Sequence, residues 1–526
     1  MPRRFPKVAL LGVLLVPALA GGFIAQEKSS AEGVQLFRQV VELVSERFVD
    51  TVSQTDLYEK AARGLLEELN DPYTELLTPK DRTAFETRTG GRYGGVGMQI
   101  EPLAGFVSVS RVFPNTPAEA AGIREGDRII AVDTQSTRDW KIDQVSAALL
   151  GTPGTKVTAT FARPGVATPI VVKFTRATIK VPAVPYAMTI DSVGYVPLLQ
   201  FNEFATEEIE EAVRKFQQQG ARGVVLDLRS NPGGILDQAL SVSNLFLRNG
   251  QEIASVRGRG FDAQTFVAQG RPVAPSIPLI VLTDGGSASA SEIVAGSLQD
   301  HDRALIVGTT SFGKGLVQTL YNLDGGYAVK MTTAKYYLPS GRLIQKERKM
   351  VDGAFVEVTP DSLEGDSVKK NRPTFRSDGG RIVYGGGGIT PDVIIKPDTI
   401  TTPEQEFYRK IAPKYTEFYT ALSDYALLLK ATVKPDFTVQ PAWRDELYRR
   451  ITAAGVPIER ELYDRATPSV DRELQRRVAH LAFGDSTAKR MSLDDDVQLK
   501  RALELLRGAR TQQDLFASAR LADRKN

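Results

Sequence analysis

Apolar and polar positions change their spacing along the chain, and these changes mark its parts. After residue 192 short apolar runs recur, at 193–201, 223–228 and 278–282, and each run predicts a buried strand. Between the runs, residues 206–219 and 235–247 carry apolar positions at helical spacing. Strands that alternate with helices are typical of an α/β layered core, which is what we expect here.

Stretches of helical spacing lie on both sides of this alternating part. Residues 35–85 carry two apolar stripes and predict a helical packing module. Beyond residue 400 the helices become strongly charged. Three aspartates at 494–496 begin one of these helices, where carboxylates interact favourably with the helix dipole. This explanation is favoured over a metal site. The C-terminal helices are expected at residues 403–412, 414–430, 443–454, 470–483 and 495–507.

A glycine-rich segment opens a separate block near residue 92. It reads Tyr93-Gly94-Gly95-Val96-Gly97-Met98-Gln99-Ile100 and runs into a predicted strand. A helix around residues 142–150 and a strand at 156–163 follow before the block ends near residue 178. On their own, these glycines are also explained by tight turns in a small β domain.

Two later segments complete the alternating part. Residues 316–323 and 327–337 flank Asp324-Gly325-Gly326 and predict a β-hairpin. Residues 347–388 are polar and glycine-rich, so we expect a mobile loop with a strand or two.

The N-terminus has the pattern of an export signal. Residues 1–26 contain basic positions, an apolar run from Val8 to Ala20 and a small-residue site at Ala18-Leu19-Ala20-Gly21. A retained anchor is the alternative. Cleavage is favoured because the apolar run is short for a membrane span and Pro17 interrupts it.

Composition narrows the chemistry further. The 526 residues carry a net charge of only +3, which gives no indication of nucleic-acid binding. The absence of cysteine excludes disulfides, thiol catalysis, cysteine metal sites and a lipidated N-terminal cysteine. Neither of the two histidines, His301 and His480, lies in a plausible turn for a Ser-His-Asp triad.

The residues after the apolar run 278–282 offer a nucleophile and a base that do not depend on histidine. Ser289 is predicted at a strand-to-helix turn, where backbone N–H groups and the helix dipole can hold a developing oxyanion. Lys314 follows twenty-five residues later between two glycines, and Gln318 lies four positions beyond it. A lysine activates a serine only when its amine is neutral, which requires burial or nearby positive charge. The pattern therefore favours a serine nucleophile with a lysine base.

These motifs resemble the active site of the C-terminal processing peptidases, also called tail-specific proteases. The resemblance rests on Ser-Ala-Ser-Glu at 289–292, Phe-Gly-Lys-Gly at 312–315 and Asp-Leu-Arg-Ser-Asn-Pro-Gly-Gly at 227–234, and it covers about residues 35–398. It implies Ser289 as nucleophile, Lys314 as base and Gln318 as the residue that positions the lysine. It also implies an oxyanion hole formed by the N–H of Ala290 and the N–H of a glycine, which is either Gly233 or Gly234.

The 92–178 block resembles a PDZ domain of the type found in bacterial proteases. Such a domain adds an extended peptide to a strand edge, and loop N–H groups hold the terminal carboxylate. The resemblance implies peptide binding at Gly95, Val96, Gly97 and Met98.

The expected protein is a multidomain α+β chain with a layered, crotonase-like serine protease core and an inserted PDZ domain. The expected parts are a signal peptide or anchor (1–26), an N-terminal helical region (27–91), the PDZ domain (92–180), the protease core (181–398) and a C-terminal helical region of open role (399–526).

The expected function is that of an exported serine endopeptidase of the bacterial periplasm or cell envelope, without metal or other cofactor. Its expected partners are proteins with exposed C-terminal tails, and no nucleic acid. An adaptor or activator protein, membrane association through the N-terminus and an oligomer stay open. Two alternatives remain. One is a PDZ-bearing scaffold with a silent protease core. The other is an esterase on the same core, against which the PDZ domain argues because small esters need no groove for a peptide end.

Overall fold

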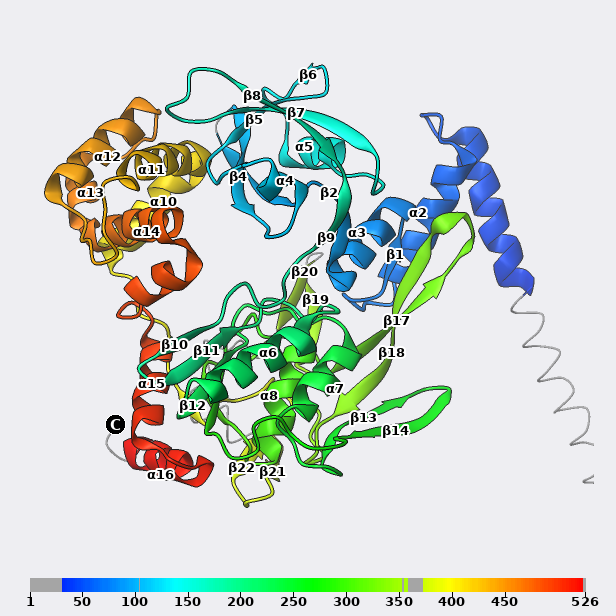
Figure 1. Cartoon of the computed structure of the whole chain (residues 1–526). Helices are drawn as coiled ribbons and strands as arrows, with labels where there is room; N and C mark the ends of the chain where they lie inside the picture. The colour runs from blue at the N-terminus through cyan, green and yellow to red at the C-terminus, as the bar shows by residue number, and fades with distance from the viewer. Residues whose placement is uncertain (1–30, 104, 352–353, 358–371, 524–526) are drawn as a thin grey trace, which may run out of the picture. The chain divides into compact units, whose positions relative to one another are not determined.

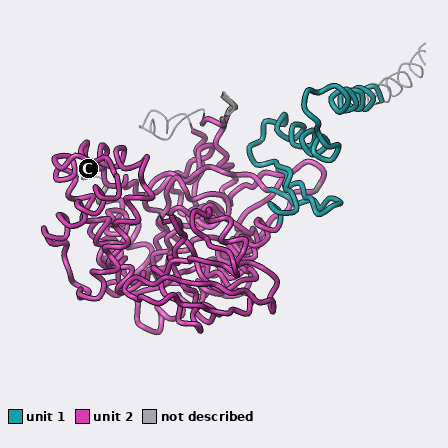
Figure 2. The backbone as a smooth tube through the Cα atoms, turned by 90° about the horizontal axis from the view of Figure 1, so that it is seen from above, with its two compact units in different colours: residues 1–82, 318–332 teal, residues 83–317, 333–526 magenta. Residues whose placement is uncertain are grey.

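The computed structural model describes residues 31–103, 105–351, 354–357 and 372–523. The chain forms two compact units (Figure 2). The first contains residues up to 82 together with 318–332, and the second contains 83–317 together with 333–526. The predicted signal or anchor at 1–26 lies outside the described residues. Within the described part, no helix is both long and apolar enough to cross a membrane.

A mostly parallel sheet forms the centre of the second unit (Figure 1). All its pairings are parallel except that of the first strand with the second. Strands β11, β12, β15 and β16 are buried along their whole length, which explains their unbroken apolar sequences. In spatial order the strands are β10 (Met188–Ile190), β11 (Val193–Pro197), β12 (Gly223–Asp227), β15 (Leu279–Thr283), β16 (Leu305–Gly308) and β23 (Val393–Ile394).

Helices cover both faces of this sheet. On one face, α6 (Ala205–Gln218), α7 (Leu236–Asn244) and α8 (Ala290–Asp300) pack into the largest apolar cluster. On the other face lie α15 (Val497–Gly508) and α16 (Gln512–Asp523), whose leucines pack against the outward side chains of the same strands. The end of the C-terminal region is therefore part of the layered core.

The 92–180 block forms its own small β domain around an apolar cluster. Its strand order is β3-β4-β5-β7-β8, so β3 (Met98–Leu103) lies at one end of the sheet. Helix α5 (Ile142–Leu149) packs close to β3. The other strands in this order are β4 (Phe106–Val112), β5 (Arg128–Val132), β7 (Lys156–Ala162) and β8 (Ile170–Thr175). The short β6 (Gln135–Ser136) pairs with β5, and β2 (Arg92–Gly95) pairs with β9 (Ala177–Lys180).

The helices after residue 400 form a separate apolar cluster centred on aromatic side chains such as Phe407 and Phe418. They are α10 (Thr402–Ile411), α11 (Tyr415–Leu429), α12 (Pro441–Ala453), α13 (Arg460–Arg465) and α14 (Thr467–Met491). Helix α14 is broken at Gly484, which has a φ of 77°.

The first unit contains a helix over residues 31–47, α2 (Gln54–Glu67) and β1 (Glu75–Leu77). Strand β1 pairs with β18 (Ala328–Tyr337), where Glu75 faces Lys330. In the predicted apolar stripe of the first helix, Val41 is buried but Phe37 remains 51 % exposed.

The predicted multidomain α+β fold with a layered core is confirmed. The predicted hairpin is also present, as β17 (Leu316–Asn322) and β18. The strand content of segment 347–388 was underestimated. Its described part forms two hairpins rather than a loop with a strand or two. These are β19 (Arg348–Val351) with β20 (Ala354–Glu357), and β21 (Thr374–Arg376) with β22 (Ile382–Tyr384). Helices α13 and α16 were not anticipated.

Charged contacts join the β domain to α14 within the second unit. Arg477 donates to Glu101 of β3 at 2.5 Å, and Arg111 of β4 pairs with Asp485. His480 lies 2.9 Å from Asp485 and 3.4 Å from Glu125. The hydrogen bond to Asp485 and the charge of Glu125 outweigh burial and the nearby Arg477, and they raise the pKa of His480.

We expect this contact to make stability depend on pH. A histidine whose pKa is raised by folding stabilises the folded state fully below its unfolded pKa of about 6.5, and the contribution is lost as the pH rises through the folded pKa. The denaturant concentration at the unfolding midpoint of the full chain should therefore decrease as the pH rises from about 6.5 through the folded pKa of His480. His480→Gln should flatten this dependence; an unchanged slope in the variant would contradict the assignment.

Candidate active site

Ser289 lies where the buried strand β15 turns into α8. It is the N-cap of the helix, with a φ of 55° and a ψ of −112°. Such a backbone conformation costs a non-glycine residue on the order of 1–3 kcal/mol and is common at functional sites. The side chain is half-buried between Ala288 and Ala290, which are both buried. The turn thus presents one hydroxyl at the beginning of a helix.

The predicted oxyanion residues lie against this turn. A methyl group placed on Gly233, which has a φ of 97°, would come 2.9 Å from the N atom of Ala290 and 3.0 Å from Cβ of Ser289. Only a residue without a side chain allows this approach. The N–H of Ala290 is the first of α8, and the first N–H groups of a helix have no acceptor within the helix. Gly233 and Ala290 are therefore brought together.

The neighbouring glycine has a different environment. Gly234 packs against the backbone of Phe201, where a Cβ would come 2.2 Å from the carbonyl oxygen. The N–H of Gly233 already donates to Oδ1 of Asn231 at 2.9 Å. Asn231 is fully buried and also binds the serine turn, because its carbonyl accepts from the N–H of Ala288 at 3.0 Å and from Oγ of Ser291 at 2.9 Å.

A buried carboxylate connects the serine turn to the lysine loop. Glu292, in the first turn of α8, is 0 % exposed. Its Oε2 accepts the N–H of Ser289 and the N–H of Lys314, each at 2.8 Å. Its Oε1 accepts the N–H of Gly313 at 2.7 Å and the hydroxyl of Ser311 at 2.5 Å. Burial raises the pKa of Glu292, while these four hydrogen bonds act in the opposite direction.

A buried phenol makes a second connection between the same two residues. The hydroxyl of Tyr336 in β18 lies 2.7 Å from the carbonyl oxygen of Lys314 and 3.3 Å from that of Ser289. Burial, with a further contribution from the Glu292 charge, raises the pKa of Tyr336 well above its usual range. The hydroxyl consequently stays protonated and serves as a donor. Ser289 and Lys314 are thus fixed side by side through their backbones.

Basic side chains surround the lysine loop. Arg348 donates to the carbonyl of Phe312 at 2.6 Å and to that of Gly313 at 3.2 Å, and its guanidinium lies 4.1 Å from the centroid of the Phe312 ring. The stem of Lys346, which is only 4 % exposed, packs against Gly313. The loop is therefore held from outside by two cationic residues.

Gln318 lies in β17, within the segment 318–332 of the first unit. Its Nε2 is 3.5 Å from Oγ1 of Thr332 in β18. The backbone N–H of Thr332 donates to Oγ1 of Thr74 at 3.1 Å. Contact between Gln318 and Lys314 stays a prediction.

The predicted peptide-binding residues lie at a groove between β3 and α5. This cavity of about 430 Å³ is lined by Gly95, Val96 and Met98, and by Leu149 and Leu150 on the opposite side. Gly97 does not line it and instead packs against Thr116.

Tyr93 also lies in this groove. Its hydroxyl donates to the carbonyl oxygen of Met98 at 3.4 Å, and burial raises the pKa of Tyr93 to about 12.

Two residues of the site were not assigned from the sequence. Glu292 had a detectable signal, since Ser-x-x-Glu at a helix start is the pattern of a capping box. Tyr336 had none, because its hydroxyl reaches Ser289 from a strand 47 residues further along the chain. In the described ranges, no group of three or more histidines, aspartates or glutamates is arranged to hold a metal ion.

Three models of known protein families match parts of the chain. The model of peptidase family S41 matches residues 192–362, and a PDZ-domain model matches residues 108–163. A model described as the N-terminal domain of the activating protease CtpB matches residues 23–80.

Curated relatives match over most of their length. A carboxy-terminal-processing protease of Bartonella bacilliformis is 38 % identical over 355 residues, which cover 66 % of this chain and 81 % of the relative. A carboxyl-terminal-processing protease of Picosynechococcus is 35 % identical over 389 residues, covering 69 % and 92 %. Among solved structures, the photosystem II D1 C-terminal processing protease matches with 27 % identity and a TM-score of 0.37, covering 70 % of this chain and 94 % of that one.

The site generates a prediction about Glu292. Glu292→Gln replaces two acceptor oxygens by one and turns an N–H donor toward the backbone N–H groups. We expect peptide cleavage to fall by about 100-fold, because the serine turn and the lysine loop lose their common anchor. The free energy of unfolding should fall by roughly 3 kcal/mol.

Glu404 provides a matched control. It occupies the same position at the start of α10, is 3 % exposed and accepts the N–H of Thr401. Glu404→Gln should lower stability without lowering kcat of the folded enzyme. Equal kcat losses in the two variants, measured on a peptide reporter, would contradict a specific role for Glu292.

Proposed function

The chain belongs to the carboxy-terminal-processing serine proteases of peptidase family S41, and we propose that it cleaves its substrates with Ser289 as nucleophile and Lys314 as general base. The observation that carries this proposal is the double connection between the two residues. One carboxylate binds both of their N–H groups, and one phenol lies at both of their carbonyls. Two residues that are twenty-five positions apart are thereby held in a fixed relation.

The proposed reaction proceeds through an acyl-enzyme. Neutral Lys314 takes the proton of the Ser289 hydroxyl as Oγ attacks the peptide carbonyl. The resulting ammonium then donates this proton to the leaving amine, and the C–N bond breaks. Water attacks the ester in the second half of the reaction, Lys314 takes its proton, and the serine hydroxyl is regenerated. The first step requires the Lys314 amine to be neutral.

We further propose that the oxyanion is held by the N–H of Ala290 and by a glycine N–H of the turn 227–234. Gly234 is the stronger candidate of the pair, because the N–H of Gly233 is occupied by Asn231. Gln318 is proposed to position the amine of Lys314, since residues four apart lie on the same side of an extended or helical segment.

The β domain is proposed to select substrates by their C-terminal tails. An extended tail would add to the free edge of β3, and the loop over Gly95, Val96, Gly97 and Met98 would hold its terminal carboxylate through backbone N–H groups. The apolar side chains of Leu149 and Leu150 in the groove favour tails that end in apolar residues. Export to a bacterial cell envelope is proposed from the pattern of residues 1–26.

Ser289 and Lys314 should both be required for cleavage. An unfolded reporter that ends in an apolar tail should be cleaved by the wild type, while Ser289→Ala and Lys314→Ala should each lower kcat by at least about 10⁴-fold. Gln318→Ala should lower kcat by about tenfold, as expected for a residue that only orients the base. Cleavage is measured by the appearance of defined fragments in mass spectrometry.

Lys335→Ala is the matched control for the lysine, because Lys335 is an exposed residue of β18. It should cleave at the rate of the wild type. Activity retained in Ser289→Ala would exclude the proposed nucleophile. Tail binding without cleavage in the wild type would instead favour a scaffold with a silent core.

A separate prediction concerns the groove. Leu150 lines it and is 41 % exposed, so Leu150→Asp should fold normally while placing a negative charge beside the bound tail. We expect KM for the tailed reporter to rise by about tenfold with kcat nearly unchanged. Val171→Asp is the control, because Val171 is a 63 % exposed residue of β8 outside the groove. Equal KM values for the two variants would contradict tail recognition at this groove.

A further inference from the structure

Arg229 in the turn after β12 is held by two carboxylates. Its Nε and Nη2 donate to Asp227 at 2.9 and 2.6 Å, and its Nη1 and Nη2 donate to Asp496 at 2.8 Å each. Nη1 also donates to Oε1 of Gln498 at 3.1 Å. The Arg229 side chain is 17 % exposed. Two such paired contacts fix the plane of a guanidinium as well as its position.

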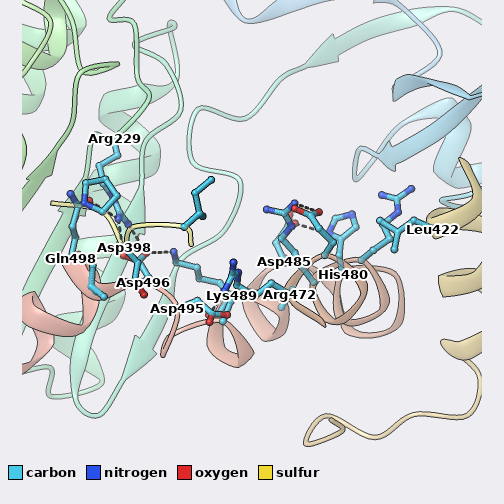
Figure 3. A pocket seen from close by; sticks show the side chains of 18 of the residues that line it. Arg229, Asp398, Leu422, Arg472, His480, Asp485, Lys489, Asp495, Asp496 and Gln498 are labelled. Carbon is cyan, nitrogen blue, oxygen red and sulfur yellow. Dashed lines mark hydrogen bonds and ion pairs between the residues drawn. The ribbon is translucent and has the colours of Figure 1, made fainter. Parts of the chain in front are cut away.

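The second carboxylate comes from the C-terminal region. Asp496 is the N-cap of α15, and its Oδ1 accepts the N–H of Leu499 at 3.0 Å. Lys489 at the end of α14 donates to Oδ2 at 2.5 Å. Figure 3 shows Asp496 between Lys489 and Arg229, along a cleft of about 700 Å³. Burial alone would raise the pKa of Asp496, but Arg229 and Lys489 outweigh it and hold the pKa well below its usual range.

The charges of this cluster balance. Asp227 and Asp496 carry two negative charges, and Arg229 and Lys489 carry two positive ones. Tyr195 completes the set by donating its hydroxyl to Asp227 at 2.8 Å. Neutralising Asp496 would leave one positive charge of the cluster without a counterion. It would also weaken the two hydrogen bonds that hold Arg229 on the side of Asp496. A partly buried charge that loses its partner costs more than an exposed one.

Arg229 begins the turn that carries the glycine candidates for the oxyanion hole. The next residue, Ser230, donates its N–H to Oδ1 of Asp284 at 2.8 Å. Asn231 then accepts the N–H of Ala288 and the hydroxyl of Ser291. One side of the turn is thus bonded to the nucleophile turn, and the other side is held through Arg229.

We propose that Asp496 is a positioning residue for peptide cleavage, because it holds Arg229 and with it the turn that gives the oxyanion hole its glycine N–H. This inference rests on the proposed function. It gives the C-terminal region, beyond its packing on the core sheet, a direct influence on the catalytic step. Asp496 itself does not touch the substrate.

The test compares two isosteric variants of the full chain. Asp496→Asn keeps a side-chain oxygen for the helix cap and removes the charge that Arg229 requires. Asp494→Asn makes the same change two residues earlier, at a carboxylate that is 94 % exposed and paired with Lys500. We expect Asp496→Asn to lower kcat by about tenfold to 100-fold with KM for the tailed reporter unchanged, as for a partly displaced oxyanion donor. Asp494→Asn should match the wild type.

Two further measurements separate positioning from a general loss of structure. Asp496→Glu restores the carboxylate and should recover part of kcat. If the loss in Asp496→Asn came only from a general structural defect, kcat would not recover when the charge is restored. Hydrogen exchange of residues 228–234 should be faster in Asp496→Asn than in Asp494→Asn. This comparison does not depend on cleavage, so it still tests Asp496 if Ser289→Ala shows that the proposed nucleophile is wrong. Equal kcat in the two asparagine variants, or equal exchange of the turn, would overturn the inference.

Discussion

The site depends on a carboxylate that has been removed from water. Placing Glu292 in the interior costs several kcal/mol, and such a cost is offset only when every lone pair finds a donor. The donors are backbone N–H groups of the serine turn and of the lysine loop, together with the hydroxyl of Ser311. Displacing either segment would leave the carboxylate partly unsatisfied. The penalty for burying one charge therefore keeps the serine turn and the lysine loop in register.

The central sheet provides the frame within which this carboxylate acts. Parallel strands end at one edge, and the turns after β12 and β15 meet there, which places Asn231 against Ala288 and Ser291. Glycine is needed where the two turns touch, because a side chain on Gly233 would collide with the backbone of Ala288. The unfavourable φ of Ser289 persists because the surrounding hydrogen bonds over-determine it.

The sequence predicted those elements that are determined by their own residues rather than by distant contacts. Continuous apolar runs predicted β12 and β15 because strands buried on both faces need no polar positions. The Ser289–Lys314 spacing was recognisable because each residue lies in a short local motif, at 289–292 and 312–315, that resembles the family's. Strand β1 was missed, since it consists of three residues stabilised by pairing with β18 more than 250 positions away. The hairpins of segment 347–388 were missed for a related reason, because strands of three or four residues are too short to show a clear alternation.

The contribution of the C-terminal region shows the limit of local sequence most clearly. The aspartates at 494–496 predicted a helix start correctly, and Asp496 is indeed an N-cap. Nothing in that pattern distinguishes a cap that faces water from one that also binds Arg229, 267 positions earlier in the chain. The Asp496 side chain both caps the first turn of α15 and binds Arg229 in the turn after β12. A region that composition marks only as charged and helical can therefore help to hold the turn after β12, because the sheet that α15 covers is the one from which that turn emerges.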